Sequence, residues 1–303
     1  MSAADEGFQS DALREALGQA LAGKPAELER LLCRMGAVVT AKPNLKLAAA
    51  FGAEMAVWRG SAAPLLARLG GDDAAPDTDR AFLPIAAAHG WTGRVRAGRE
   101  VQAAWAALAE LAADERAPVR AGTLDALVAL AARDGGADPL VEQARSWLDA
   151  EDREQRYGAA ALVIEVLGDR RVLSRLRDRE ALLDYLSRTV AEFADAPRSA
   201  DRSDARRRGL AALPRTLAAV IADANAGERA QRWLEAECTR ADHPQVREAL
   251  SNTIIALRAP AYGQSPAVVE ALRKSLEGSA KPLRDPTRLR PGTGRGKASR
   301  RTR

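Results

Sequence analysis

The strongest constraint on the fold of this chain is an apolar pattern that repeats with the period of an α-helix. Positions i, i+4, i+7 and i+11 of one helical face are all apolar at Val101, Trp105, Leu108 and Ala112. The same face recurs in the segments 124–131, 183–193 and 246–257, and no segment carries a convincing strand pattern. Aromatic residues make up only 4% of the chain, and its apolar content leans on Ala and Leu, which favour helices. We therefore expect an all-α protein.

Glycine and proline residues divide the pattern into short helices. Breaks are expected at Gly70-Gly71, Gly135-Gly136 and Gly168-Asp169, because glycine readily adopts the left-handed turn that ends a helix. Helix starts are expected at Asn44, as the cap of a helix from Leu45, and at Ser265 before Pro266. The prolines that fit the first helical position are Pro118, Pro244 and Pro266. Pro64 and Pro84 lie inside apparent helices, which they either kink or end.

A short motif occurs twice, each time just before an apolar run. Residues 114–120 read DERAPVR, and residues 242–247 read DHPQVR. A degenerate copy places Glu151-Asp152 ahead of Arg156, which follows Arg120 by 36 residues. An Asp in a turn, followed by Val-Arg at the start of the next helix, resembles the HEAT repeat. The resemblance is clear over 97–167 and 205–258, although the proline often found in the first HEAT helix is absent from 97–112.

The HEAT resemblance implies a right-handed superhelical solenoid, here of roughly six to seven helix pairs, because each pair has an apolar back that only its neighbour covers. We assign residues 1–277 to this solenoid and 1–42 to a pair of N-terminal capping helices. The resemblance also implies a ladder of hydrogen bonds between repeats. Its residues in this chain are Asp114, Arg120, Arg156, Asp242 and Arg247.

The positive charge of the chain is concentrated at its C-terminal end. Residues 278–303 hold nine Lys or Arg against the single acid Asp285, a net charge of +8. The remaining residues, 1–277, hold 37 basic and 40 acidic residues, a net charge of −3. We predict that 278–303 is a disordered basic tail. It is either a solubilising extension or an electrostatic tether to nucleic acid.

Cysteine usage and hydropathy predict a cytoplasmic protein. Cys33 and Cys238 are far apart and have no metal-ligand spacing, which is typical of two free thiols in a reducing compartment. The first residues lack the basic and apolar regions of a signal peptide. No window has the length and apolarity of a transmembrane helix, so no membrane partner is expected.

No catalytic, metal-binding or cofactor-binding constellation is evident. His89 and His243 are the only histidines, and they fit helix ends better than catalytic roles. Segment 292–297, GTGRGK, lacks the first glycine of a phosphate-binding loop, since Pro291 stands in its place. Trp105 and Trp147 keep helical spacing with apolar neighbours and are expected in the core.

The sequence therefore predicts a non-enzymatic scaffold that binds another protein, without cofactors. Arginine-rich stretches supply the candidate partner-binding residues, which are Trp91, Arg94, Arg96, Arg206 and Arg207. An aromatic ring beside two arginines can stack a base or hold an acidic peptide.

The alternative is an enzyme similar to the AlkD-type alkylpurine DNA glycosylases, which are built from HEAT-like repeats. In that interpretation Trp91, Trp105, Arg94, Arg96 and Tyr157 surround a DNA cleft. No position matches the catalytic Asp of that family, and the acidic body argues against duplex binding.

Overall fold

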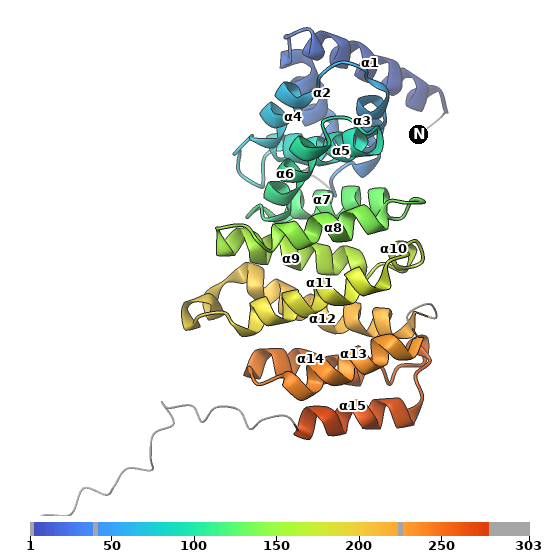
Figure 1. Cartoon of the computed structure of the whole chain (residues 1–303). Helices are drawn as coiled ribbons and strands as arrows, with labels where there is room; N and C mark the ends of the chain where they lie inside the picture. The colour runs from blue at the N-terminus through green and yellow to red at the C-terminus, as the bar shows by residue number, and fades with distance from the viewer. Residues whose placement is uncertain (1–2, 39–41, 224–226, 279–303) are drawn as a thin grey trace, which may run out of the picture.

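The computed structural model describes residues 3–38, 42–223 and 227–278, and every regular element among them is a helix. The principal helices stack in two layers that run the length of the molecule (Figure 1). One layer, here called layer A, contains α4 (Ala63–Gly70), α6 (Val101–Ala112), α8 (Ala137–Trp147), α11 (Arg179–Ala194), α13 (Gly227–Arg240) and α15 (Pro266–Gly278). The other, layer B, contains α3 (Leu45–Val57), α5 (Phe82–Arg96), α7 (Ala117–Ala131), α9 (Arg153–Leu167), α12 (Asp204–Ala222) and α14 (Pro244–Ala256). The predicted all-α solenoid is confirmed, while its handedness stays a prediction.

Layer B forms the continuous spine of the molecule. Each of its helices packs on the next one along the chain in that layer, from α3 to α14. In α5 every residue from Phe82 to Arg94 is buried, because α3, α4, α6 and α7 all pack against this helix. Burial on all sides removes apolar surface that a lone helix pair would leave in water, so the repeats stabilise each other.

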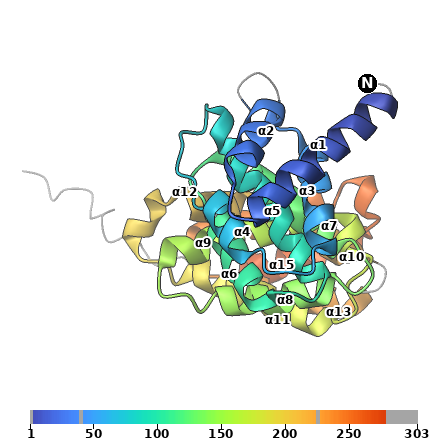
Figure 2. The ribbon, with the colours of Figure 1, turned by 90° about the horizontal axis from the view of Figure 1, so that it is seen from above.

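The first end of the stack is covered by two helices, α1 (Ala3–Leu21) and α2 (Ala26–Gly36). They pack against each other, and α2 also contacts α3 and α5. Both lie within the segment 1–42 that was predicted to cap the solenoid. Viewed down the stack, α1 extends beyond the other helices at its N-terminal end (Figure 2). At the other end α15 closes the described chain, and the predicted tail lies outside the described residues from 279 onward.

Most predicted helix starts are confirmed. The side chain of Asn44 accepts a hydrogen bond from the Leu47 amide at 3.2 Å and caps α3. α14 begins at Pro244, and α15 begins at Pro266 after Ser265, whose hydroxyl oxygen accepts from the Val268 amide. The two prolines with an open role, Pro64 and Pro84, lie in the first turns of α4 and α5. At such positions a missing amide hydrogen breaks no helical hydrogen bond.

Arginines at the turns from layer A to layer B share one local geometry. Each donates from its guanidinium to a backbone carbonyl six residues earlier: Arg120 to Asp114 at 2.8 Å, Arg156 to Ala150 at 2.6 Å, and Arg247 to Ala241 at 2.9 Å. These carbonyls follow the ends of α6, α8 and α13, where the helix leaves acceptors without partners. The positive charge also suits the negative end of the helix dipole.

Two of these arginines also connect neighbouring repeats. Arg156 Nη2 lies 2.9 Å from Glu192 Oε1 of α11, and Arg247 Nη2 donates to the Leu276 carbonyl of α15 at 2.8 Å. No side-chain bond joins Asp114 to Arg120, so this part of the implied ladder is corrected. The Asp114 carboxylate instead pairs with Arg116 at 2.7 Å.

The inter-repeat contact at this turn is made by Arg116, which was not predicted. Its Nη1 donates to the backbone carbonyls of Asp72 at 2.7 Å and Ala74 at 3.0 Å, in the segment after α4. Asp242 is exposed, and within the described ranges its carboxylate makes no hydrogen bond or ion pair. The aspartates therefore do not form the repeated side-chain ladder that the HEAT resemblance implies.

Aromatic packing supports the layer A interface. The rings of Trp105 in α6 and Trp147 in α8 meet edge to face with their centroids 6.1 Å apart, which confirms their expected core positions. Both cysteines are free thiols, and burial raises the pKa of the Cys238 thiol to about 12.

Candidate partner-binding groove

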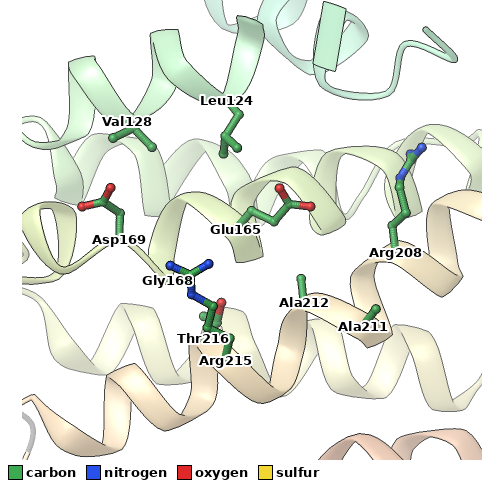
Figure 3. A pocket seen from close by; sticks show the side chains of 10 residues that line it. All are labelled: Leu124, Val128, Glu165, Gly168, Asp169, Arg208, Ala211, Ala212, Arg215 and Thr216. Carbon is green, nitrogen blue, oxygen red and sulfur yellow. The ribbon is translucent and has the colours of Figure 1, made fainter. Parts of the chain in front are cut away.

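A hollow of about 520 Å³ crosses the face of layer B at the middle of the stack. Figure 3 shows its lining residues, which come from α7, α9, the turn that follows α9, and α12. The residues that line it are Leu124, Val128, Glu165, Gly168, Asp169, Arg208, Ala211, Ala212, Arg215 and Thr216. Three helices that are distant in sequence therefore form one groove, with apolar groups from α7 along one wall and charged groups from α9 and α12 opposite.

Small side chains create the groove. The Thr216 hydroxyl donates to the Ile164 carbonyl at 2.7 Å, which ties α12 closely to the C-terminal end of α9. A Cβ at Gly168 would lie only 2.7 Å from Thr216 Oγ1, so a side chain there would force these helices apart. Ala211 and Ala212 add no bulk above this contact, and the space over them stays open.

Glu165 is an exposed residue whose carboxylate lies in the middle of the groove. Burial raises the pKa of its carboxyl, and the nearby charges of Arg208, Arg120 and Arg215 oppose that shift. In the part of the chain that the structure describes, its carboxylate makes no hydrogen bond and no ion pair. Glu165 is therefore a carboxylate that is unpaired within the described residues and accessible from the groove.

The other charged groups of the groove differ in how far they are satisfied. Arg208 pairs with Asp204 at 3.0 Å, and Asp169 pairs with Arg171 at 2.8 Å while its carboxylate caps α10 (Arg170–Leu173). Arg215 is exposed and makes no side-chain hydrogen bond or ion pair within the described residues. The groove thus offers one exposed, unpaired anion and one exposed, unpaired cation beside an apolar wall.

Three of the five predicted partner-binding residues are buried, which corrects that part of the prediction. The exposed fractions are 2% for Trp91, 1% for Arg94 and 0% for Arg206. Arg94 pairs with Glu100 at 2.7 Å, and Arg206 donates to the Phe193 carbonyl at 2.6 Å. These guanidiniums satisfy internal acceptors, since a buried charge without partners is costly.

Arg96 and Arg207 are exposed, as a partner-binding role requires, and that role stays a prediction. Arg96 lies two residues after Arg94 on α5, on nearly the opposite side of the helix. Arg207 pairs with Asp204 at 3.5 Å on the surface of α12. Neither residue lines the groove over α7, α9 and α12.

The residues considered for a glycosylase-like cleft do not gather around one cavity, since only Arg96 and Trp105 line a common hollow, which is about 640 Å³. Trp105 and Tyr157 are 3% and 0% exposed, and the Tyr157 ring packs on Phe193 with centroids 5.9 Å apart. Together with the burial of Trp91 and Arg94, this leaves Arg96 as the one exposed member of that set.

Sequence reasoning missed Glu165 and Arg215. A signal existed for Glu165, because it is the one charged residue in the otherwise apolar run AAALVIEVL at 159–167. An acid in such a run must reach solvent or a partner. Arg215 had no comparable signal, because its neighbourhood depends on how α12 packs against α9.

Comparisons with known proteins leave the family open. No family model matches this chain, and no curated protein matches it. Among solved structures it is similar to a designed armadillo repeat protein, YIII(Dq)4CqI, at 16% sequence identity and a TM-score of 0.29. That match covers 75% of this chain and 100% of the designed protein. A match this distant supports no argument about the fold, which is described by the two-layered stack of helices itself.

Two further findings concern metal ions and membrane spans among the described residues. Among them, no group of three or more His, Cys, Asp or Glu side chains is placed to hold a metal ion. No helix in the described ranges has the length and apolarity needed to cross a bilayer.

Proposed function

We propose that this protein is a non-enzymatic scaffold whose layer B groove holds an extended segment of another protein. The observation that carries the proposal is the pair of exposed charges without protein partners, Glu165 and Arg215, beside the apolar side chains of Leu124 and Val128. A polypeptide can contact the anion, the cation and the apolar wall at once, because it carries basic, acidic and apolar side chains at close spacing.

A protein segment suits the groove better than a nucleic acid does. Residues 1–277 carry a net charge of −3, and the groove contains Glu165 and Asp169 as well as Arg208 and Arg215. Binding to a phosphate backbone depends on many cationic contacts, and two carboxylates among them would weaken it. No observation favours the glycosylase alternative.

Site-specific photo-crosslinking tests the proposal. A benzoyl-phenylalanine at Ala211, which is exposed in the groove, is compared with one at Ala236, which is exposed on α13 in layer A. In extracts of the source cells we expect a protein adduct at Ala211 that is absent at Ala236. Crosslinks to nucleic acid alone, or identical adducts at both positions, would contradict the proposal.

The captured partner, once purified, allows a quantitative test by titration calorimetry. We expect Glu165→Gln and Arg215→Gln each to weaken binding about tenfold, since a hydrogen bond to a charged group contributes about 1.5–3 kcal/mol. Glu235→Gln and Arg232→Gln change the same charges on exposed positions of α13 and should leave the affinity unchanged. If the groove variants and the α13 variants weaken binding equally, the partner does not bind in the groove.

The role of the basic segment is tested separately by gel shift. The full chain is compared with a 1–278 truncation, which keeps α15 whole, using duplex DNA and single-stranded RNA at two salt concentrations. A shift that requires the segment and disappears at high salt would support an electrostatic tether.

A further inference from the structure

Arg96 and Arg133 form a pair of exposed cations at the ends of two adjacent layer B helices. Arg96 is the last residue of α5, and Arg133 follows the end of α7 by two residues. Both side chains line two hollows. One, of about 640 Å³, opens toward α8 and Arg175, and the other, of about 170 Å³, crosses α3, α5 and α7 on the layer B face. The two guanidiniums therefore stand on the wall that the hollows share.

Neither arginine has an anionic partner. Within the described residues, the side chains of Arg96 and Arg133 make no hydrogen bond and no ion pair. Arg175, on the far wall of the larger hollow, is paired with Asp134. Burial lowers the pKa of Arg96, and the positive charge of Arg133 lowers it further. The protein thus holds two like charges close together, and the carboxylate that lines the larger hollow, Asp134, is paired with Arg175 instead.

The helix ends explain how this pair is tolerated without a ligand. Each arginine lies at the C-terminal end of its helix, where the helix dipole stabilises a cation by about 0.3–1 kcal/mol. That stabilisation is small compared with a charge-assisted hydrogen bond, so the donors of both guanidiniums stay available.

A second group that lines the smaller hollow, His89, makes no hydrogen bond through its Nε2 and has the Asp125 carboxylate nearby. His89 lines it together with both arginines and is only 3% exposed. Its Nε2 has no hydrogen-bond partner and lies 3.6 Å from Asp125 Oδ2, which is too far for a hydrogen bond. Buried polar atoms are normally hydrogen-bonded, so His89 Nε2 adds a polar group with unused bonding capacity to the hollow that the two arginines line.

We propose that Arg96 and Arg133 bind a phosphoryl group of a phosphate monoester. A phosphate monoester carries a charge of about −1.5 to −2 at neutral pH, which matches two unpaired arginines, whereas a carboxylate neutralises only one. The planar guanidinium also matches phosphate oxygens with two parallel hydrogen bonds. The two sources of such a group are a phosphorylated side chain of a protein and a small phosphorylated metabolite. This site is separate from the Glu165 groove and does not depend on it.

Titration calorimetry on the full chain tests the site. The probes are inorganic phosphate, O-phosphoserine, a phosphoserine peptide, and the same peptide with Ser or Glu at that position. We expect the phosphorylated probes to bind and the Ser and Glu peptides to bind at least tenfold more weakly. A peptide that binds more tightly than O-phosphoserine identifies a protein source, and equal affinities identify a small molecule.

Four variants separate a specific site from general electrostatics. Arg96→Gln and Arg133→Gln should each weaken phosphoserine binding at least tenfold. Arg96→Lys keeps the charge but loses the paired hydrogen bonds, so it should recover only part of the affinity. Arg232→Gln removes an exposed arginine from layer A and should have no effect.

The proposal is overturned if no phosphorylated probe binds at millimolar concentration. It is also overturned if Arg96→Gln weakens binding no more than Arg232→Gln does. Thermal unfolding of each variant verifies that the exposed substitutions leave the fold intact. Because Glu165 and Arg215 lie elsewhere, these outcomes leave the crosslinking result at Ala211 unaffected.

Discussion

Buried Arg94 forms an ion pair with partly exposed Glu100, with Arg94 Nε 2.7 Å from Glu100 Oε2, and the pair holds the connection between α3 and α4 in place. The other guanidinium nitrogens of Arg94 donate to the backbone carbonyls of Met55 at 3.1 Å, Trp58 at 2.6 Å and Gly60 at 2.9 Å. One side chain on α5 therefore satisfies the carbonyls at the end of α3.

Glu100 completes the arrangement from the other side. Its carboxylate accepts from the Ser61 hydroxyl at 2.6 Å and from the Ala62 and Ala63 amides, both at 3.1 Å, at the start of α4. Burial opposes ionisation of this carboxyl, but these hydrogen bonds and the charge of Arg94 outweigh it and hold its pKa below the usual value. Glu100 adopts a left-handed backbone with φ of 48°, a costly conformation that these contacts offset.

Removing Arg94 should be among the most destabilising changes in the chain. We expect Arg94→Met to lower the free energy of unfolding by about 2–4 kcal/mol, because the carbonyls of Met55, Trp58 and Gly60 lose a charged donor and Glu100 loses its partner. Arg99→Met removes a more exposed guanidinium that also donates to Trp58, and it should cost only about 1 kcal/mol. Urea unfolding followed by circular dichroism measures both, and equal losses would contradict the central role of Arg94.

Gly93 allows α3 and α5 to cross with their backbones in contact. A Cβ at Gly93 would lie 2.2 Å from the Gly52 carbonyl oxygen, and neither backbone can move without disturbing the stack. We expect Gly93→Ala to destabilise the protein by about 3 kcal/mol. Gly18→Ala in α1 meets no atom within 4 Å and should stabilise it by about 0.5–1 kcal/mol. Melting temperatures that move in the same direction for both would contradict this packing.

Arg120 should contribute a moderate amount to stability. Its guanidinium donates to the carbonyls of Asp114 at 2.8 Å and Glu115 at 2.6 Å. Arg120→Ala leaves both carbonyls without this donor, and we expect a loss of about 1–2 kcal/mol. Arg232→Ala, which removes an exposed arginine on α13, is the control. An unchanged melting temperature for Arg120→Ala would show that water replaces the guanidinium without cost.

The lowered pKa values of the two histidines lead us to expect a smaller free energy of unfolding in mild acid. Burial lowers the pKa of His89, with Asp125 opposing the shift, and burial followed by the charge of Arg206 lowers that of His243. The unfolded chain therefore binds protons in a range where the folded protein does not. We expect the free energy of unfolding to fall between about pH 7 and about pH 5.5.

Substitution of each histidine tests its share of this dependence. His89→Gln should flatten the pH profile, and so should His243→Asn, which keeps an acceptor for the Gln245 amide that His243 now caps. If both variants lose stability with falling pH as steeply as the unsubstituted protein does, the acid sensitivity belongs to carboxyl groups instead.

The turn arginines show what was predictable from sequence. Arg120, Arg156 and Arg247 each lie six residues after the carbonyl that they bind, so the contact is set by the local course of one turn. The expected aspartate contacts failed because Asp114 has a closer partner in Arg116, which no repeat pattern indicated. Contacts within a turn follow from sequence spacing, and competition between partners does not.

The sequence by itself determined the helices, their ends and their stacking in pairs. Apolar periodicity, prolines at helix starts such as Pro244, and glycine breaks all act within a few residues, so they are legible along the chain. Only the tertiary structure decided which side of each helix is covered. Arg94 is buried and Arg96 is exposed because α3 packs on one side of α5, and Glu165 and Arg215 line the same groove because α12 packs on α9. Burial depends on the rotation of each helix relative to its neighbours, and that rotation results from packing over the whole stack.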